Sequence, residues 1–410
     1  MGERTWGKGA CMNPAIVIPS YWAADAVDAQ APGAYDHSTD LNAPKPELDA
    51  CLASLEQVRD VCRVIVLVVS PPSSADAARE RVRAIARSHP ALTVTVLTER
   101  EAARIRDRVD RIAPRAPGEP VSLRGYGAIR NMGLAAASIL AHDCVIFLDD
   151  DEIVLGPDFM KKALYALGQQ TRQGLPILAK SGYFYDREGS PLADTSKADA
   201  THRWWTKRIE FNRWMRRALS GTRISRSNYV CGGLFALHAR AYMRVAFDPW
   251  ITRGEDLDYL FNMRMHGLDV WFDNEWVVRH LPPPSVHRAP RFMQNVYRWY
   301  YERAKLAFAA RQHDLEPVTP ASLMPYPGPW FSSELDECVR KTAFARMMLT
   351  SERVGYGRIW RHGRELAERY ADENKSKYIR FQSFWPSIMD GLWNDEELSE
   401  MLEEATCREN

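Results

Sequence analysis

The stretch Val145-Ile-Phe-Leu-Asp-Asp-Asp-Glu152 decides the fold, because four apolar residues run directly into four acids. A run that is apolar on both faces is typical of a buried strand in a parallel sheet. Carboxylates that follow such a strand repel one another unless a cation lies among them, and their oxygens suit Mg²⁺ or Mn²⁺. The alternative for an isolated aspartate run is a solvated turn or a helix N-cap. The position after a strand favours the metal site.

Three more apolar runs lie upstream and end at proline or polar residues: Ala15–Ile18, Val64–Val69 and Leu92–Leu97. Apolar side chains at helical spacing predict helices between the runs, over 48–61, 76–88 and 131–140. Strands that alternate with helices predict an open α/β sheet with right-handed crossovers. Ligands of such sheets bind beyond the carboxyl ends of the strands, which points to Ser20, Ser70 and Asp149. Beyond about Pro290 the strand signals stop and helices are expected, over 291–311, 333–348, 359–371 and the tail from Asp390.

The composition excludes several classes of protein. The chain has 410 residues, 46% hydrophobic and 26% charged, which is typical of a soluble globular protein of two or three domain equivalents. Lys+Arg 54 against Asp+Glu 53 argues against a nucleic-acid partner. Seven scattered cysteines without a CxxC pair predict reduced thiols rather than zinc ligands. Because no apolar run reaches about 18 residues, we expect a cytoplasmic protein, or one that rests on a membrane surface.

The segment Arg124-Gly-Tyr-Gly-Ala-Ile-Arg130 is a second candidate for ligand binding. Glycines allow close backbone approach, and arginines pair with phosphate or with sugar hydroxyls. The spacing is not GxGxxG, so it does not indicate a Rossmann dinucleotide site. The alternative is a helix start with Arg130 on its solvated face.

Two further segments carry chemistry-bearing residues. Glu255 and Asp256, in Gly254-Glu-Asp-Leu-Asp258, lead an amphipathic helix. The helix dipole favours acids there without any catalysis, but one of them could also be a general base for an acceptor hydroxyl. His280 ends the run Val277-Val-Arg-His280 before three prolines; a lone histidine is more often structural, and the alternative is that it faces the metal.

Together these segments resemble the GT-A fold glycosyltransferases, most closely the family 2 type, over about residues 14–285. The similar segments are the opening strand and nucleotide loop at Ala15–Tyr21, the ARNxGL-like segment 127–134 beside the donor, the DxD-like Asp149–Asp151, the loop Gly232-Gly233 that borders the donor sugar, and the ED-like Gly254–Asp256. The resemblance implies a GT-A domain at 12–285, with a Rossmann-like, mostly parallel sheet flanked by helices, and a helical region at 286–410.

The resemblance also implies metal-dependent transfer of a sugar from a nucleotide-diphosphate sugar to a hydroxyl acceptor, with inversion and a carboxylate base. It assigns the base to Asp256 or Glu255. It assigns donor binding to Pro19, Ser20, Tyr21, Arg124, Arg130, Asp149, Asp150, Gly232 and Gly233. It assigns Mn²⁺ or Mg²⁺ to Asp149 and Asp151, with His280 as a third ligand.

Some features depart from the family pattern or leave alternatives open. Ser70-Pro-Pro72 stands where many relatives have acids that hold the nucleotide base, so the base is not identified; the long loop 22–47, with Asp36 and His37, could substitute. A retaining synthase that acts on a small anionic acceptor stays open. A GT-A-like nucleotidyltransferase is the other alternative, but Pro19-Ser-Tyr21 is not its Gly/Arg-rich loop. A non-catalytic binding module is disfavoured by the acids and His280.

The basic stretch His202–Arg226 bears on the acceptor. Eight Lys and Arg residues stand there against one acid, Glu210, with Trp204, Trp205 and Trp214 among them. We expect a surface helix that packs its tryptophans on the core. The alternatives are a cradle for an anionic acceptor and an interfacial helix on anionic lipid. Near-neutral net charge favours a small soluble or saccharide acceptor over a lipid. Homo-oligomerisation stays open.

Overall fold

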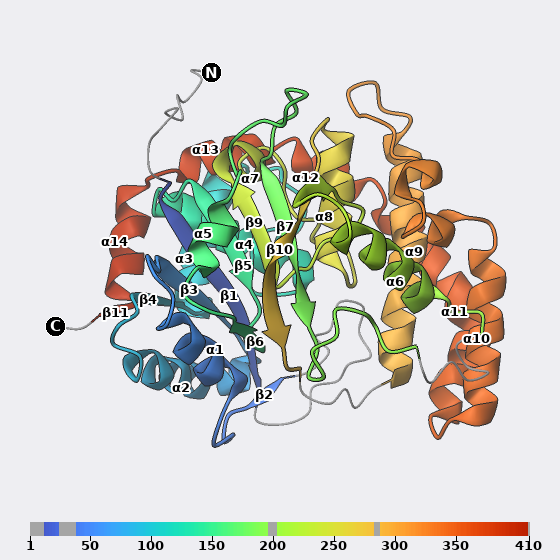
Figure 1. The fold of residues 1–410 in the computed structure, drawn as a ribbon, viewed down its shortest axis with the longest axis horizontal. Coiled ribbons are helices and arrows are strands. Elements are labelled where there is room, and N and C mark those ends of the chain that lie inside the picture. The colour runs from blue at the N-terminus through green and yellow to red at the C-terminus, as the bar shows by residue number, and fades with distance from the viewer. Residues whose placement is uncertain (1–11, 24–37, 196–202, 283–287, 409–410) are drawn as a thin grey trace.

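The computed structural model describes residues 12–23, 38–195, 203–282 and 288–408. One sheet runs through the molecule in the order β11-β4-β3-β1-β5-β9-β7-β10-β6, with β2 paired to β1 and β8 to β10 (Figure 1). Its strands are β1 (Pro14–Ala23), β2 (Thr39–Asp40), β3 (Arg63–Val69), β4 (Val94–Leu97), β5 (Cys144–Leu148), β6 (Glu152–Val154), β7 (Ala179–Tyr185), β8 (Ile224–Arg226), β9 (Leu234–His238), β10 (Trp271–His280) and β11 (Thr406–Cys407).

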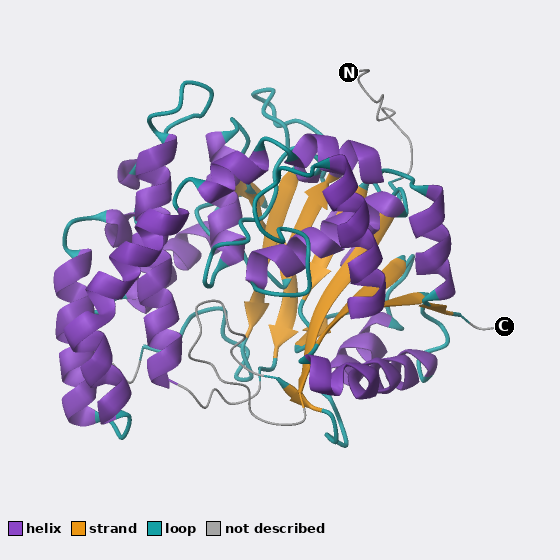
Figure 2. Ribbon diagram, turned by 180° about the vertical axis from the view of Figure 1, so that it is seen from behind, coloured by secondary structure: helices purple, strands orange, loops and turns teal. Residues whose placement is uncertain are grey.

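Helices flank the sheet on both faces (Figure 2). They are α1 (Glu47–Leu55), α2 (Ala75–Arg87), α3 (Glu99–Ile112), α4 (Tyr126–Ile139), α5 (Phe159–Leu164), α6 (Lys207–Leu219), α7 (Ala239–Tyr242), α8 (Glu255–Met265), α9 (Arg288–Ala309), α10 (Leu335–Leu349), α11 (Arg353–Asn374), α12 (Lys377–Gln382), α13 (Trp385–Leu392) and α14 (Glu396–Glu404). Short 3-10 turns lie at Pro72–Ser74, Pro320–Leu323 and Gly328–Phe331.

The core consists of two apolar layers, one on each face of the sheet. Along β1 the side chains alternate between them: Ala15 and Val17 belong to one layer, and Ile16 and Ile18 to the other. The smaller layer packs under α1, α2 and α5, and the larger under α3, α4, α8 and the C-terminal helices. Burial on both faces explains why these strands read as unbroken apolar runs.

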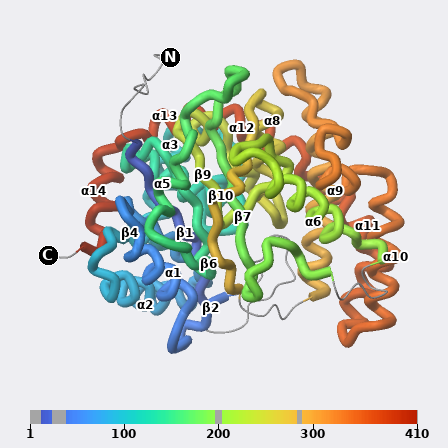
Figure 3. Tube along the Cα trace, viewed as in Figure 1, coloured from blue at the N-terminus to red at the C-terminus, as the bar shows by residue number. Residues whose placement is uncertain are grey.

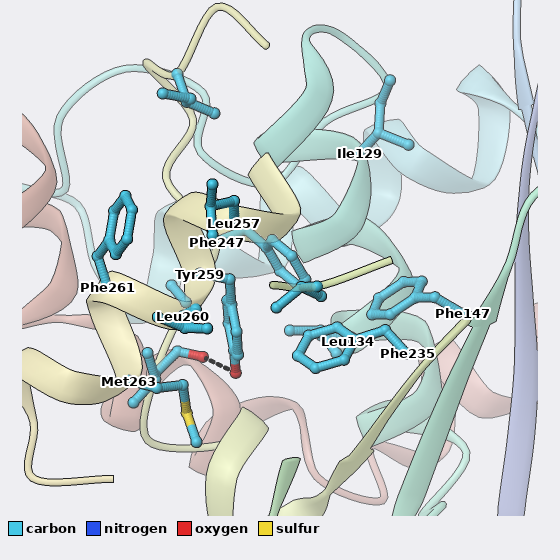
Figure 4. Packing of buried hydrophobic residues seen from close by; sticks show 14 of the residues in the cluster. Ile129, Leu134, Phe147, Phe235, Phe247, Leu257, Tyr259, Leu260, Phe261 and Met263 are labelled. Carbon is cyan, nitrogen blue, oxygen red and sulfur yellow. Dashed lines mark hydrogen bonds between the residues drawn. The ribbon is translucent and has the colours of Figure 1, made fainter. Parts of the chain in front are cut away.

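The ring of Tyr259 shows how α8 is seated on the larger layer. It packs on Phe247, with 4.2 Å between ring centroids, and lies edge-on to Phe235 at 5.6 Å. Its hydroxyl donates a hydrogen bond of 3.0 Å to the Val245 carbonyl (Figure 4). These contacts fix the N-terminus of α8 over the sheet.

Strand directions bring distant segments to one edge. β4, β3, β1 and β5 are parallel, while β9 is antiparallel to both β5 and β7, and β7 is parallel to β10. The carboxyl ends of β5 and β10 therefore share an edge with the start of β9. Asp149, Gly233 and His280 meet at that edge although they are far apart in sequence. This mixed, mostly parallel sheet flanked by helices confirms the predicted fold class.

The chain differs from the sequence-based expectations in several bounds. β1 does not stop at Pro19 but continues to Ala23. Its ladder with β5 ends at Val17, so one side of β1 carries no partner at Pro19, where a proline is tolerated. α1 ends at Leu55 rather than at residue 61. Asp36 and His37 lie outside the described residues.

The C-terminal residues return to the first strands. β11 pairs antiparallel with β4, so a strand exists beyond Pro290, contrary to the expectation of helices alone. The red tube of the C-terminal residues returns to the side of β4 in Figure 3. α13 and α14 pack against α3 and α4. The predicted domain boundary at 285 lies outside the described residues, and the large apolar layer extends on both sides of it, from Ala15 to Leu402. Within the described residues, every helix is too short or too polar to cross a bilayer.

Candidate active site

The four acids after β5 lie in different environments. Asp149 and Asp150 are half-buried, whereas Asp151 and Glu152 are 5% and 2% exposed. The Ser20 hydroxyl donates to Asp150 Oδ2 at 2.6 Å and itself accepts from Trp22 Nε1 at 2.8 Å. Burial, then the charge of Asp151, raises the pKa of Asp150 well above its usual range. Ser20 therefore holds the Asp150 carboxyl in place through a hydrogen bond from β1.

Arg130 connects this cluster to α8. Its Nη2 donates to Asp149 Oδ1 at 2.8 Å, and its Nε donates to Glu255 Oε1 at 3.2 Å. The guanidinium carbon lies 4.9 Å from the centroid of the Phe147 ring. Because Arg130 is only 5% exposed, the alternative that placed it on a solvated helix face is wrong. It lies at the site predicted for the donor.

Gly233 and Glu152 are in close contact. A Cβ atom on Gly233 would lie 2.4 Å from Glu152 Oε2, so a larger residue cannot be accommodated without movement. Burial, then the charges of Asp149 and Asp151, raises the pKa of Glu152 well above its usual range. Glu152 ends the acidic run after β5 but was not among the predicted site residues.

His280 and Asp151 lie side by side, with 3.3 Å between Nε2 and Oδ2. Phe184 packs against the imidazole at 4.8 Å between centroids, and the Leu281 amide donates to the Asp151 carbonyl at 2.9 Å. Imidazole nitrogen and carboxylate oxygen are both ligands for Mn²⁺. Asp149, the third predicted ligand, pairs with Arg130. No group of three or more His, Cys, Asp or Glu side chains is arranged around one cation position in the described part of the chain.

The acids at the start of α8 have three different partners. Glu255 is 7% exposed and pairs with Arg130. Asp258 is fully buried and bonds Lys305 of α9 and Asn262. Asp256 lines the cleft beside Gly232. A Cβ atom added to Gly232 would lie 3.2 Å from the Cβ atom of Asp256. Glu255 and Asp256 both line the cleft, whereas Asp258 does not.

Gly254 allows α9 to approach the start of α8. It has φ +70°, in the left-handed region, and a Cβ there would lie 1.8 Å from Arg298 Nη1. Only glycine meets both conditions. The segment 254–256 therefore lies beside the buried Arg298.

The structure does not bring every predicted residue to the cleft. The side chain of Arg124 is 71% exposed, lies 4.0 Å from Glu119 Oε2 and is not part of the cleft lining. The structure therefore does not bring Arg124 to the cleft. Pro19 and Ser20 are buried in β1 beneath the acids, and Tyr21 follows them, half-buried.

The cleft at the sheet edge has a volume of about 650 Å³. One end holds the acids 149–152, the glycine loop and His280. The other end is lined by basic residues from α6, from the loop before α8 and from α9: Lys207, Arg208, Arg253, Arg291 and Arg298. Arg253, Arg291 and Arg298 belong to no motif that was recognised in the sequence.

Residues 207–219 of the basic stretch form α6, whereas residues 224–226 form β8. Trp214 is 6% exposed and packs edge-on to Phe272, with 5.2 Å between centroids. This confirms that a tryptophan of the stretch packs on the core. Lys207, the first residue of α6, turns to the cleft, while Arg216 and Arg217 are exposed.

A second cavity, of about 640 Å³, lies beside α6 on the side away from the acids. Arg264 lines it, but this arginine already bonds Asp269 at 3.2 Å and Asn228 Oδ1 at 2.8 Å. The chemistry-bearing groups gather in the first cleft.

Comparison with known proteins identifies a family and several similar solved structures. The model of the family "Glycosyltransferase like family 2" matches residues 62–302. A search of curated protein sequences finds no match. A solved mannosyltransferase from Pyrobaculum calidifontis, in complex with GDP-Man and Mn²⁺, is 16% identical, with a TM-score of 0.45 over 95% of this chain and 89% of that one. Glucosyl-3-phosphoglycerate synthase from Mycobacterium tuberculosis, with Mn²⁺ and UDP-Glc, is 16% identical, with a TM-score of 0.33 over 67% of this chain and 72% of that one.

Proposed function

Because the chain belongs to glycosyltransferase-like family 2 and is thus a glycosyltransferase, we propose that it transfers a sugar from a nucleotide-diphosphate sugar to a hydroxyl acceptor with inversion. The observation that carries this proposal is the position of Asp256. It faces the cleft next to Gly232, while Glu255 is engaged by Arg130 and Asp258 by Lys305. Asp256 is thus the acid best placed to be the base.

The donor would bind at the acidic end of the cleft. Gly232 leaves space for the sugar beside Asp256 and Arg130, and Gly233 leaves space for the buried carboxyl of Glu152. Arg130, held by Asp149 and Glu255, lies where it can orient the donor. We assign Mn²⁺ or Mg²⁺ to Asp151 and His280, with Asp149 beside them. Such a cation, when bound, neutralises the charge that develops on the leaving diphosphate.

In the proposed reaction Asp256 accepts the proton of the acceptor hydroxyl. The hydroxyl oxygen forms a bond to the anomeric carbon as the bond from that carbon to the diphosphate oxygen breaks. One displacement inverts the configuration, and it needs one carboxylate on the acceptor side of the sugar. Arg130 fixes the position of Glu255, the residue before the base, and so helps to orient it.

Two experiments test the proposal. A panel of nucleotide sugars, screened with Mn²⁺ or Mg²⁺ for thermal stabilisation and slow hydrolysis, identifies the donor, because a ligand that binds the folded state raises the melting temperature. The anomeric configuration of the product, read by ¹H NMR, then tests the base. Inversion is expected, and retention would overturn the assignment of Asp256.

The proposal places the enzyme in a reducing compartment, the cytoplasm. Each cysteine in the described part of the chain is free, and Cys51, Cys144 and Cys231 are buried. Unpaired buried thiols are typical of proteins that fold under reducing conditions.

A further inference from the structure

Three cations gather in the cleft on the side of Asp256 away from the acids of β5. Lys207 begins α6, Arg253 precedes Gly254, and Arg298 belongs to α9. All three line the cleft together with Asp256. They come from three separate elements, so their convergence results from the tertiary packing and not from one basic helix face.

Arg298 has an unmet hydrogen-bonding group in the cleft wall. The residue is 3% exposed, and its Nε donates to Glu302 Oε1 at 3.1 Å. Its Nη2 is buried without a hydrogen-bond partner. Contact with Gly254 and with the Trp299 ring, 4.7 Å from the guanidinium carbon, holds the group in place. An unpaired buried donor carries a free-energy penalty that an acceptor atom from a ligand would remove.

The ammonium group of Lys207 lies 5.5 Å from the Trp299 ring centroid. Among the described residues Lys207 makes no ion pair within 4.0 Å. Burial, then the neighbouring Arg298 and Arg253, lowers the pKa of Lys207 to about 7, against the opposite influence of Asp256 and Glu302. The lysine therefore lies where a negative charge would stabilise its protonated form.

The acids nearby do not balance these cations. Glu302 pairs with the Nε of Arg298 at 3.1 Å, and Asp256 lines the same cleft. Two acids therefore stand beside the three basic residues Lys207, Arg253 and Arg298. A net positive pocket that is partly closed to water attracts an anion.

We propose that Lys207 and Arg298, with Arg253, bind a phosphate or carboxylate group of the acceptor, so that the acceptor is an anionic hydroxyl compound. Asp256 stands between these cations and the Gly232 loop, which places the acceptor hydroxyl at the base when the anionic group is held. The role of this ligand as acceptor rests on the proposed function, but the binding of an anion does not.

The first test uses inorganic phosphate as the probe, titrated by calorimetry in the presence of a chelator and without donor. The unmodified protein is expected to bind phosphate. Lys207→Ala and Arg298→Gln should each weaken binding at least tenfold. Arg216→Ala, which removes an exposed cation from the same helix, should leave it unchanged. Equal binding by Lys207→Ala and the unmodified protein would overturn the proposal, as would no binding at all.

A second readout covers the case in which Arg298→Gln fails to fold. Lysines are labelled by reductive ¹³C-methylation, and the Lys207 resonance is assigned with Lys207→Ala. Its apparent pKa should rise when phosphate is added, because the bound anion favours the charged form. An unchanged titration curve at saturating phosphate would contradict a contact with Lys207.

The source of the anionic group is distinguished in a third step. Glycerol phosphate and glycerol are compared as binders in solution, and phosphatidylcholine vesicles with and without phosphatidic acid are compared by cosedimentation. A preference for glycerol phosphate without sedimentation indicates a soluble acceptor, and sedimentation that requires Lys207 indicates a lipid phosphate. If anions bind but no nucleotide sugar is ever turned over, the proposed function fails and the anion site stands.

Discussion

Arg130 and Asp149 form an ion pair of 2.8 Å that joins α4 to the end of β5. Through its other edge the same guanidinium reaches Glu255, 3.2 Å away, at the start of α8. The contact with Glu255 is shielded from water on both sides and is stronger than a surface pair, whereas the Asp149 side chain is 35% exposed. The Arg130 side chain thus fixes the position of α8, which carries the proposed base, relative to the acids that follow β5.

Arg130→Lys is expected to impair catalysis more than its unchanged charge suggests. A lysine cannot bond two carboxylates along two edges as the planar guanidinium does. We expect kcat to fall by about 10²-fold, because a misplaced base and donor lose orientation. Steady-state kinetics with the identified nucleotide sugar measure this. Arg124→Lys, in the same segment but exposed, is the matched control, and equal rates for the two variants would refute the role of Arg130.

Asp151→Asn tests the metal assignment. The amide keeps the volume of the side chain but removes the charge beside His280, so the cation should bind weakly. We expect kcat to fall by about 10³-fold with the fold intact, the magnitude typical of losing charge stabilisation in a transition state. Rates are measured across a Mn²⁺ titration and compared with Asp158→Asn, an acid on the surface. Full activity of unmodified enzyme in a chelator would contradict the assignment.

Much of the fold could be predicted because β1, β3, β4 and β5 are buried on both faces and read as apolar runs. The later strands have weaker sequence patterns. β9 runs antiparallel to β7, and β6 and β8 are only three residues long. β11, with two residues, forms only because the chain end returns to β4. No local sequence pattern predicts the pairing of β11 with β4.

The same distinction holds for the site. Asp149, Asp151 and Asp256 follow a strand or begin a helix, so their positions in the chain point to the sheet edge. Arg298 could not be found in this way, because it reaches the cleft only when α9 packs against Gly254. Arg124 is the reverse case: its neighbours suit a ligand loop, but its exposed side chain does not line the cleft.

Substitution of the acids of α8 should separate their roles. Asp256→Asn removes the proposed base, and we expect kcat to fall by about 10²- to 10⁴-fold with little change in donor affinity. Glu255→Gln weakens the contact with Arg130 and should instead reduce donor affinity. Both are followed by donor titration and by single-turnover transfer. If Asp256→Asn transfers at the normal rate, the base is a different group.

Lys305→Met is expected to destabilise the protein without touching the cleft. Lys305 is fully buried and bonds Asp248 at 2.8 Å, Asn262 at 3.0 Å and also Asp258. Its loss leaves two buried carboxylates without a cation, a penalty of about 3–5 kcal/mol in the free energy of unfolding. Urea denaturation measures it. Lys341→Met, which breaks an exposed pair with Glu337, should cost less than about 1 kcal/mol.

Acid should destabilise the fold through two histidines. Burial lowers the pKa of His142 to about 4 and that of His238, which also lies near Arg240, to about 4. In the unfolded chain both have a pKa near 6.5, so the unfolded state binds more protons between pH 6.5 and 4. The free energy of unfolding is therefore highest above pH 6.5 and decreases as the pH falls towards 4.

The histidine contribution can be isolated by substitution. From pH 7 to pH 5 each histidine should remove roughly 2 kcal/mol from the free energy of unfolding. His142→Gln should reduce the total loss by that amount, whereas His313→Gln, on the surface, should not change it. Urea denaturation at the two pH values gives both differences. Identical pH dependence in His142→Gln and the unmodified protein would show that His142 is not the group that titrates.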